Sequence, residues 1–190
     1  MSSSPASARL RTIFMTLLVV VSLVGAACSS AGSSSGDLPD LEDVPGAEAS
    51  PEDGDRAPDF TVMTVDGAGF TLSEHFENDG RPVFLNMWAS WCPPCRAEMP
   101  DIDAASQSHE DVKFIGVAAN DDPVESTAFA TSIGIGYTIG FDPNGDVAGD
   151  YKVVGLPASY VISADGIIVE RIFGSVTEAD IDEILGKWFS

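Results

Sequence analysis

The chain of 190 residues is long enough for one domain of ordinary size and additional segments. Its hydrophobic content of 44% and its 10 phenylalanines support a packed core and argue against a disordered chain. The formal net charge of −21 excludes a nucleic-acid-binding protein that depends on phosphate contacts, because such a protein needs clustered lysine and arginine.

The first 27 residues have the composition of an export signal. Arg9 and Arg11 precede an apolar run at 13–27, which is shorter than the ~20 residues that a membrane span needs. Small residues close the run. We therefore expect residues 1–27 to be a signal peptide that takes the chain out of the cytoplasm.

Cys28 follows this segment directly, in the sequence LVGAAC. The stretch resembles the lipobox of bacterial lipoproteins, although Gly25 stands where those sites favour leucine. The resemblance implies that Cys28 is acylated and anchors the chain to the outer face of the bacterial cytoplasmic membrane. Ordinary cleavage after Ala27, which would give a secreted protein, and an uncleaved anchor are the alternatives. Residues 28–56 are rich in serine, glycine, proline and acids, and we expect them to form a disordered linker.

Residues 57–190 have the pattern of a folded domain. An Asp-Gly dipeptide between two strand-like runs predicts a hairpin over 60–72. The unbroken apolar segment 82–88 predicts a strand that is covered on both faces. A helix is expected from Cys95 to about 106, with two prolines before it and with Pro100 as a kink.

The C-terminal half continues the alternation and ends in an antiparallel pair. The expected elements are a strand at 112–119, a helix at 123–134, a weak strand at 137–141, a short helix ending near 150, a hairpin at 158–174 and an amphipathic helix at 177–189. Alternating units followed by a hairpin predict an α/β domain: a central mixed β-sheet with helices on both faces.

The motif Cys92-Pro-Pro-Cys95 permits three kinds of chemistry. A zinc site needs two further ligands, and His75 and His109, which we expect on the surface, are not in paired spacing. A permanent disulfide would close a very small loop and stabilise little. In a redox pair, the helix N-terminus would stabilise a Cys92 thiolate, and Cys95 would resolve the mixed disulfide. The redox interpretation explains most, and it needs no metal and no bound cofactor.

The segments NMWASWCPPCRAEMP and VVGLPASYVIS resemble the extracytoplasmic thioredoxin-like proteins of the TlpA, ResA and DsbE type, and the resemblance covers about 57–190. It implies a thioredoxin-like fold with an N-terminal β-hairpin extension and the activity of a thiol–disulfide oxidoreductase. Pro157 matches the cis-proline that faces the two cysteines. Leu156 matches the residue whose backbone pairs with bound substrate, and Trp91 matches the aromatic residue beside the nucleophile.

One position departs from cytoplasmic thioredoxin. Asn86 stands where thioredoxin has a buried aspartate that helps to deprotonate the resolving thiol, and asparagine cannot accept a proton at neutral pH. The extracytoplasmic relatives draw an acid from the segment after the next strand. Asp121, Asp122 and Glu125 are the candidates in this sequence.

The resemblance favours a monomeric reductase that acts on protein disulfides, such as those of apocytochrome c during cytochrome c maturation, and that receives electrons from a transmembrane thiol carrier. An oxidant that introduces disulfides into exported proteins is the main alternative. A thiol peroxidase would need threonine where Ala89 stands. A copper-delivery protein would need a histidine near the cysteine pair, and none occupies a matching position.

Overall fold

The computed structural model describes residues 51–189. The predicted signal peptide, the predicted acylation at Cys28 and the linker up to residue 50 therefore lie outside the described residues. Within 51–189, no helix combines the length and the apolar character that crossing a membrane would require.

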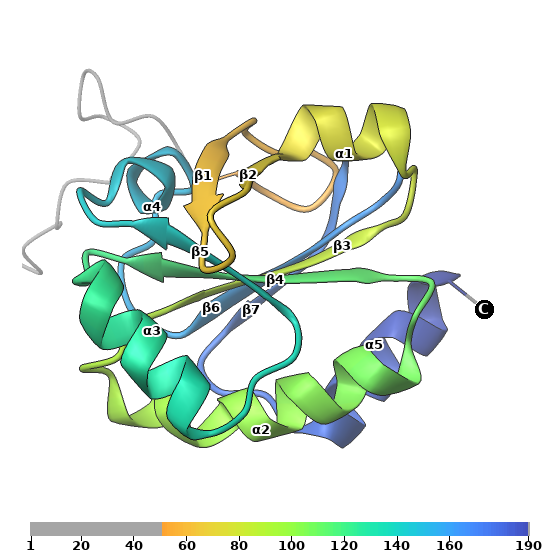
Figure 1. The fold of residues 1–190 in the computed structure, drawn as a ribbon. Coiled ribbons are helices and arrows are strands. Elements are labelled where there is room, and N and C mark those ends of the chain that lie inside the picture. Colours follow the sequence, from red (N-terminus) through yellow and green to blue (C-terminus); the bar gives the residue numbers. More distant parts are fainter. Residues whose placement is uncertain (1–50, 190) are drawn as a thin grey trace, which may run out of the picture. The chain divides into compact units, whose positions relative to one another are not determined.

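The strands form one mixed sheet in the order β2-β1-β5-β4-β3-β6-β7 (Figure 1). The central strands β3, β4 and β5 are parallel, and the other neighbouring pairs are antiparallel. The strand bounds are β1 Thr61–Thr64, β2 Gly69–Thr71, β3 Val83–Trp88, β4 Lys113–Ala119, β5 Thr138–Asp142, β6 Ala158–Ile162 and β7 Ile168–Phe173. Both predicted hairpins, β1–β2 and β6–β7, and the mixed sheet are confirmed.

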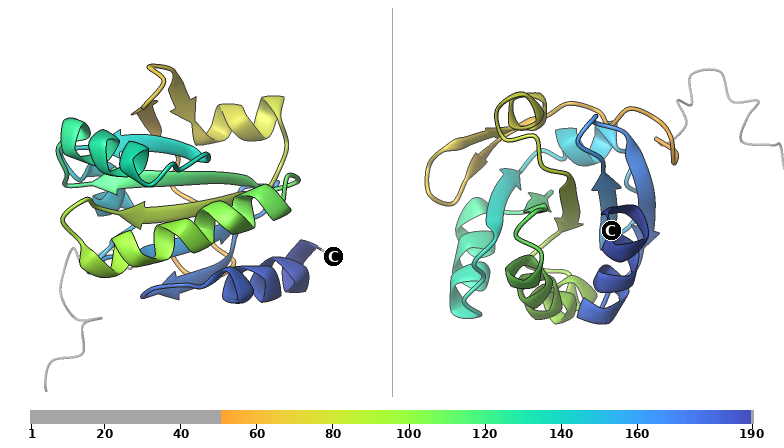
Figure 2. Two further views of the ribbon diagram at one scale, coloured as in Figure 1. Left: turned by 60° about the horizontal axis from the view of Figure 1, so that its bottom comes forward. Right: turned by 90° about the vertical axis from the view of Figure 1, so that its right-hand side faces the viewer.

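Helices cover both faces of this sheet, as the sequence predicts (Figure 2). One face carries α2, α3 and α5, and the other carries α1 and α4. The helix bounds are α1 Leu72–Asn78, α2 Pro93–Ser108, α3 Pro123–Ser132, α4 Asp146–Asp150 and α5 Glu178–Phe189.

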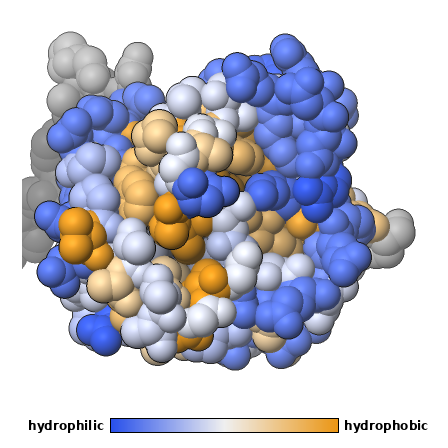
Figure 3. Space-filling view, in the orientation of Figure 1, coloured by the Kyte–Doolittle hydropathy of each residue, from blue (hydrophilic) through white to orange (hydrophobic). Residues whose placement is uncertain are grey.

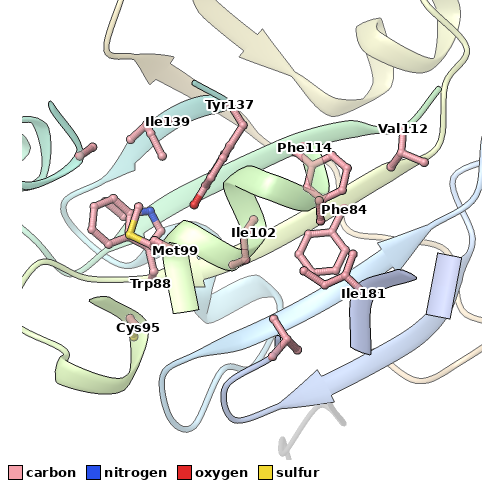
Figure 4. Close-up of a cluster of buried hydrophobic side chains, with 14 of the residues drawn as sticks. Phe84, Trp88, Cys95, Met99, Ile102, Val112, Phe114, Tyr137, Ile139 and Ile181 are labelled. Atoms are coloured by element: carbon pink, nitrogen blue, oxygen red, sulfur yellow. The ribbon is translucent and has the colours of Figure 1, made fainter. Parts of the chain in front are cut away.

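Strand β3 lies inside the sheet, between β4 and β6, and supplies side chains to both cores. All of its residues are buried, which fits the unbroken apolar segment. Phe84 and Trp88 pack with α2 and α5, whereas Leu85 and Met87 pack on the face of α1 and α4. Figure 4 shows the first of these clusters, with Cys95 beside Trp88 and Met99. The core on the α2 side therefore reaches the start of that helix.

Helix α2 begins earlier than predicted. Cys92 is the N-cap, and Pro93 and Pro94 occupy the first helical positions, where a missing backbone N–H costs nothing. Pro100 lies inside the helix, which continues to Ser108. Helix α1, over Leu72–Asn78, was not predicted at all, because seven residues are too few to show a helical period.

Residues 51–56, which the sequence assigned to the linker, are joined to the edge strand β7. The Gly54 amide donates to the Ile168 carbonyl at 2.7 Å, and the Ile168 amide donates to the Asp55 carbonyl at 2.9 Å. Arg171 on β7 donates to the Pro51 carbonyl at 2.9 Å. The ordered domain therefore begins earlier in the chain than residue 57, and this segment covers a strand edge that would otherwise be open.

The prediction that His75 lies on the surface is wrong. Its side chain is buried in α1, and its Nε2 is 3.0 Å from the Arg81 carbonyl. Burial lowers the pKa of this imidazole, and the hydrogen bond to Arg81 only partly opposes the shift. His109 keeps partial exposure and pairs with Asp182 at 2.7 Å. Both histidines thus have structural partners away from the cysteine pair.

Candidate active site at the start of helix α2

Cys92 and Cys95 form a disulfide at the N-terminus of α2, with their Cα atoms 5.3 Å apart. Both are buried, at 4% and 0% exposure. Cys92 Sγ accepts a hydrogen bond from the Cys95 amide at 3.3 Å. The unpaired amides and the positive end of the helix dipole stabilise negative charge at this place. A thiolate formed at Cys92 on reduction would receive that stabilisation.

Pro157 lies at the start of β6, and the peptide bond from Leu156 to Pro157 is cis. The turn after β7 connects this proline to the start of α2. The Gly174 amide donates to the Pro157 carbonyl at 3.0 Å, and the Ser175 hydroxyl donates to the Pro94 carbonyl at 3.4 Å. The proline loop and the cysteine pair are therefore held by one short turn.

Large apolar side chains are exposed around these elements. Trp91, directly before Cys92, is 60% exposed, and its indole Nε1 donates to the Asn120 carbonyl at 3.2 Å. Val154, in the loop that leads to Pro157, is 96% exposed, and Phe173 at the end of β7 is also exposed. Figure 3 shows hydrophobic surface near β1 and β5 and separate hydrophobic spots on α3, whereas α1 is covered by hydrophilic residues.

Glu98 is the buried acid of the site, and it is not among the acids predicted from the sequence. It follows Cys95 by three residues on α2, so the two side chains lie on the same face of the helix. Only 2% of Glu98 is exposed. Burial raises the pKa of its carboxyl to about 7, and hydrogen bonds from Asn86 and from the Val176 amide only partly oppose the shift.

Asn86 holds the Glu98 carboxyl from the strand below. Its Nδ2 donates to Glu98 Oε1 at 2.9 Å and to Ser159 Oγ at 3.0 Å. Asn86 therefore occupies the position of the missing aspartate and binds an acid that comes from the helix instead. The signal for Glu98 was present in the sequence: it is the acid one turn after the second cysteine, on the helix that the motif predicts.

The three predicted acids lie at the start of α3. Asp121 is buried, and its carboxylate accepts hydrogen bonds from Ser90 and Ser126. Asp122 caps α3 by accepting from the Val124 amide at 2.7 Å, and Glu125 is exposed in the first turn of that helix. Each of the two aspartates thus has a structural task, whereas Glu98 shares a helix face with Cys95.

Over residues 51–189, no group of three or more histidine, cysteine, aspartate or glutamate side chains is arranged to hold a metal ion.

Comparisons with known proteins agree with this geometry. The model of the AhpC/TSA family matches residues 54–171. The thiol-disulfide oxidoreductase ResA of Bacillus thuringiensis subsp. konkukian is 30% identical over 138 residues, which are 72% of this chain and 78% of that protein. The chain belongs to the AhpC/TSA family, among its ResA- and DsbE-like thiol–disulfide oxidoreductases.

Two further members of this group align over most of their length. The thiol:disulfide interchange protein HelX of Rhodobacter capsulatus is 31% identical over 167 residues, or 87% of this chain and 88% of that protein. The crystal structure of a putative interchange protein DsbE from Chlorobium tepidum superposes with a TM-score of 0.65 at 28% identity, covering 73% of this chain and 96% of that one. The protein is therefore a thiol–disulfide oxidoreductase with a thioredoxin-like fold.

Proposed function

We propose that this oxidoreductase is a membrane-tethered, extracytoplasmic reductase of protein disulfides, with Cys92 as the nucleophile and Cys95 as the resolving thiol. The observation that carries the assignment of the two cysteines is the buried carboxyl of Glu98 on the same helix face as Cys95, with a pKa of about 7, whereas the direction follows the family resemblance. A base with a pKa near the working pH is well suited to take a proton from a thiol. It then returns that proton to solvent when the cycle closes.

The chemistry runs in two exchanges. The Cys92 thiolate attacks a substrate disulfide, its sulfur bonds to one substrate sulfur, and the other substrate sulfur leaves as a thiolate that takes a proton from solvent. Cys95 then gives its proton to Glu98 and attacks Cys92 Sγ, which releases the second substrate thiolate. Two electrons pass from the cysteine pair to the substrate, and the disulfide seen in the structure is the product. A transmembrane thiol carrier would reduce it again.

Partner proteins would dock on the exposed apolar residues around the disulfide. Trp91 and Val154 offer apolar contact area, and the backbone of Leu156 would pair with the extended substrate segment. The cysteine-bearing segments of apocytochrome c are the substrate that the family resemblance suggests. The alternative is the opposite direction, in which the disulfide is passed to exported proteins.

The equilibrium of the cysteine pair with glutathione tests the direction. A reductase should have a potential below about −200 mV, close to the roughly −270 mV of thioredoxin, whereas a potential well above about −200 mV would favour the oxidant. Cys95→Ala adds a second test, because it should trap the natural partner as a mixed disulfide with Cys92. The purification of apocytochrome c in that adduct would support the proposed substrate.

The tether needs a separate experiment. Cys28→Ser should release the protein from the membrane fraction into the extracytoplasmic soluble fraction, and the mass of the wild-type N-terminus should show an acylated cysteine. An equal distribution of both forms would remove the lipid anchor from the proposal and leave the redox chemistry intact.

A further inference from the structure

Asp121 lies where two loops meet beside the cysteine pair. One loop precedes Cys92 and contains Ser90, and the other joins β4 to α3 and contains Asp121 itself. Asp121 Oδ2 accepts from the Ser90 amide at 2.5 Å, and its Oδ1 accepts from the Ser90 hydroxyl at 2.9 Å. The residue two positions before the nucleophile is thus bound through both its backbone and its side chain.

Two further donors contact the Asp121 carboxylate. Oδ1 accepts from the Asp122 amide at 2.9 Å, and Oδ2 accepts from the Ser126 hydroxyl at 2.8 Å. The single proton of the Ser126 hydroxyl is shared with the Asp122 carbonyl, which lies 2.9 Å from the same oxygen. Asp121 is thus held by donors from the loop before Cys92, from its own loop and from α3, and this arrangement gives it a structural role beside the cysteine pair.

The neighbouring residue Asn120 binds the side chain of Trp91 through its backbone carbonyl. Its carbonyl accepts from Trp91 Nε1 at 3.2 Å. Asn120 has a left-handed backbone, with φ of 51°, and its own amide donates to the Asp142 carbonyl at 2.9 Å. Its side chain fits closely against Gly145, where an added Cβ would come within 2.8 Å of Asn120 Cγ. The carbonyl that receives the indole is thus fixed from several directions.

Together these bonds hold an exposed tryptophan in one orientation. Trp91 is 60% exposed, and an exposed side chain that is free in solution loses rotamer entropy when a partner binds. Because Asp121 binds Ser90 and the Asn120 carbonyl binds the indole, part of this entropy is already lost before a partner binds. The cysteine pair itself lies in the first turn of α2 and shares no hydrogen bond with Asp121 among the described residues.

We propose that Asp121 is a positioning residue that preorganises Trp91 for docking of the partner protein, and that it sets the rate of reaction with protein substrates without setting the redox equilibrium of the cysteines. This inference rests on the proposed function, because it assumes that Trp91 contacts the substrate. It separates two properties of the site: affinity for a protein is controlled by the loop, and redox chemistry is controlled by the helix.

The test is a double-mutant cycle on the full-length protein, with insulin as the protein disulfide. Asp121→Ala and Trp91→Ala should each lower the second-order rate constant for insulin reduction by about tenfold. If Asp121 acts through Trp91, the double variant should be no more than about twofold slower than either single variant. Multiplied effects of about a hundredfold would overturn the inference, as would an Asp121→Ala variant that reacts like the wild type.

Equilibration with glutathione supplies the second readout. The equilibrium constant depends on the relative free energies of the dithiol and disulfide forms and not on docking, so all variants should keep the wild-type value, and a tenfold change in Asp121→Ala would contradict the proposal. Ser126→Ala is the matched control, because it removes one donor to Asp121 and leaves Ser90 bound; it should reduce insulin at the wild-type rate. A wild-type protein that reacts with neither probe would refute the proposed function instead.

A milder variant keeps the inference testable if Asp121→Ala does not fold. Ser90→Ala removes the hydroxyl bond to Asp121 and keeps the amide bond, so it should fold and slow insulin reduction by about threefold. The same non-additivity with Trp91→Ala is expected. Full additivity in this pair would count against the inference whether or not Asp121→Ala folds.

Discussion

The buried carboxyl of Glu98 should make the stability of the disulfide form depend on pH. In the folded protein its pKa is about 7, compared with an ordinary value of 4.5. Well below pH 4.5 the carboxyl is protonated in both the folded and the unfolded chain, so its titration does not change the free energy of unfolding. As the pH rises from 4.5 to 7, the unfolded chain loses its proton while the folded chain retains it, so folding becomes less favourable.

The magnitude follows from the shift. Each pKa unit corresponds to about 1.4 kcal/mol, so the wild-type free energy of unfolding should fall by about 3 kcal/mol relative to a variant without this titration. Glu98→Gln is that variant. Its amide can still accept from Asn86, but its N–H faces the Val176 amide, which adds a cost of about 1–3 kcal/mol that does not depend on pH. The prediction therefore concerns the change with pH and not the offset.

Urea unfolding of the oxidised proteins between pH 4 and pH 8 measures this change. The difference in unfolding free energy, Glu98→Gln minus wild type, should rise by about 3 kcal/mol over the range. Titrations elsewhere in the protein cancel in the difference. Glu125→Gln, which removes a carboxyl from the exposed start of α3, reports the effect of losing one negative charge. A flat difference, or one that falls with pH, would refute the argument that burial controls Glu98.

Three other variants test separate parts of the structure. Cys95→Ala should halt the reaction at a mixed disulfide with Cys92, which non-reducing electrophoresis detects as an adduct; fast turnover by this variant would contradict the two-exchange scheme. Gly116→Ala should destabilise the protein by about 1–3 kcal/mol in thermal or urea unfolding, because the added Cβ would lie 3.0 Å from Trp88 Nε1. Arg171→Ala should expose the 51–56 segment to proteases while lowering global stability by only about 1 kcal/mol, and unchanged cleavage would show that the backbone bonds to β7 suffice.

The parts of the fold that were predicted are those with a strong local pattern. The apolar run of β3, the turn dipeptides of the two hairpins and the two prolines before Cys95 each indicate their element without knowledge of the rest of the chain. The 51–56 segment has no such pattern, because backbone hydrogen bonds to β7 hold it and these are independent of side-chain composition. Its acidic residues therefore looked like linker.

The residues of the candidate site also fall into those with a local sequence pattern and those without one. Cys92, Cys95 and Pro157 lie in short motifs, so the resemblance located them directly. Glu98 could not be assigned from composition, because a glutamate on a helix is usually exposed and only tertiary packing decides otherwise. The acids around the start of α3 were predicted because the resemblance indicates an acid in that segment, whereas in the structure the Asp121 carboxylate accepts hydrogen bonds from Ser90, the Asp122 amide and Ser126.

Thioredoxin carries its buried acid on the strand, whereas this protein carries a glutamate on the helix. The difference changes which element determines the distance between the acid and Cys95. Because Glu98 and Cys95 share α2, their separation is fixed by helix geometry and not by how closely the helix packs on the sheet. The hydrogen bonds to Glu98 come from elsewhere: Asn86 lies on β3 and the Val176 amide precedes α5. The carboxyl is therefore carried by the helix that also carries Cys95, while its hydrogen-bond donors belong to the sheet and to the turn before α5. Burial between these elements, and not a neighbouring charge, is the main cause of its raised pKa.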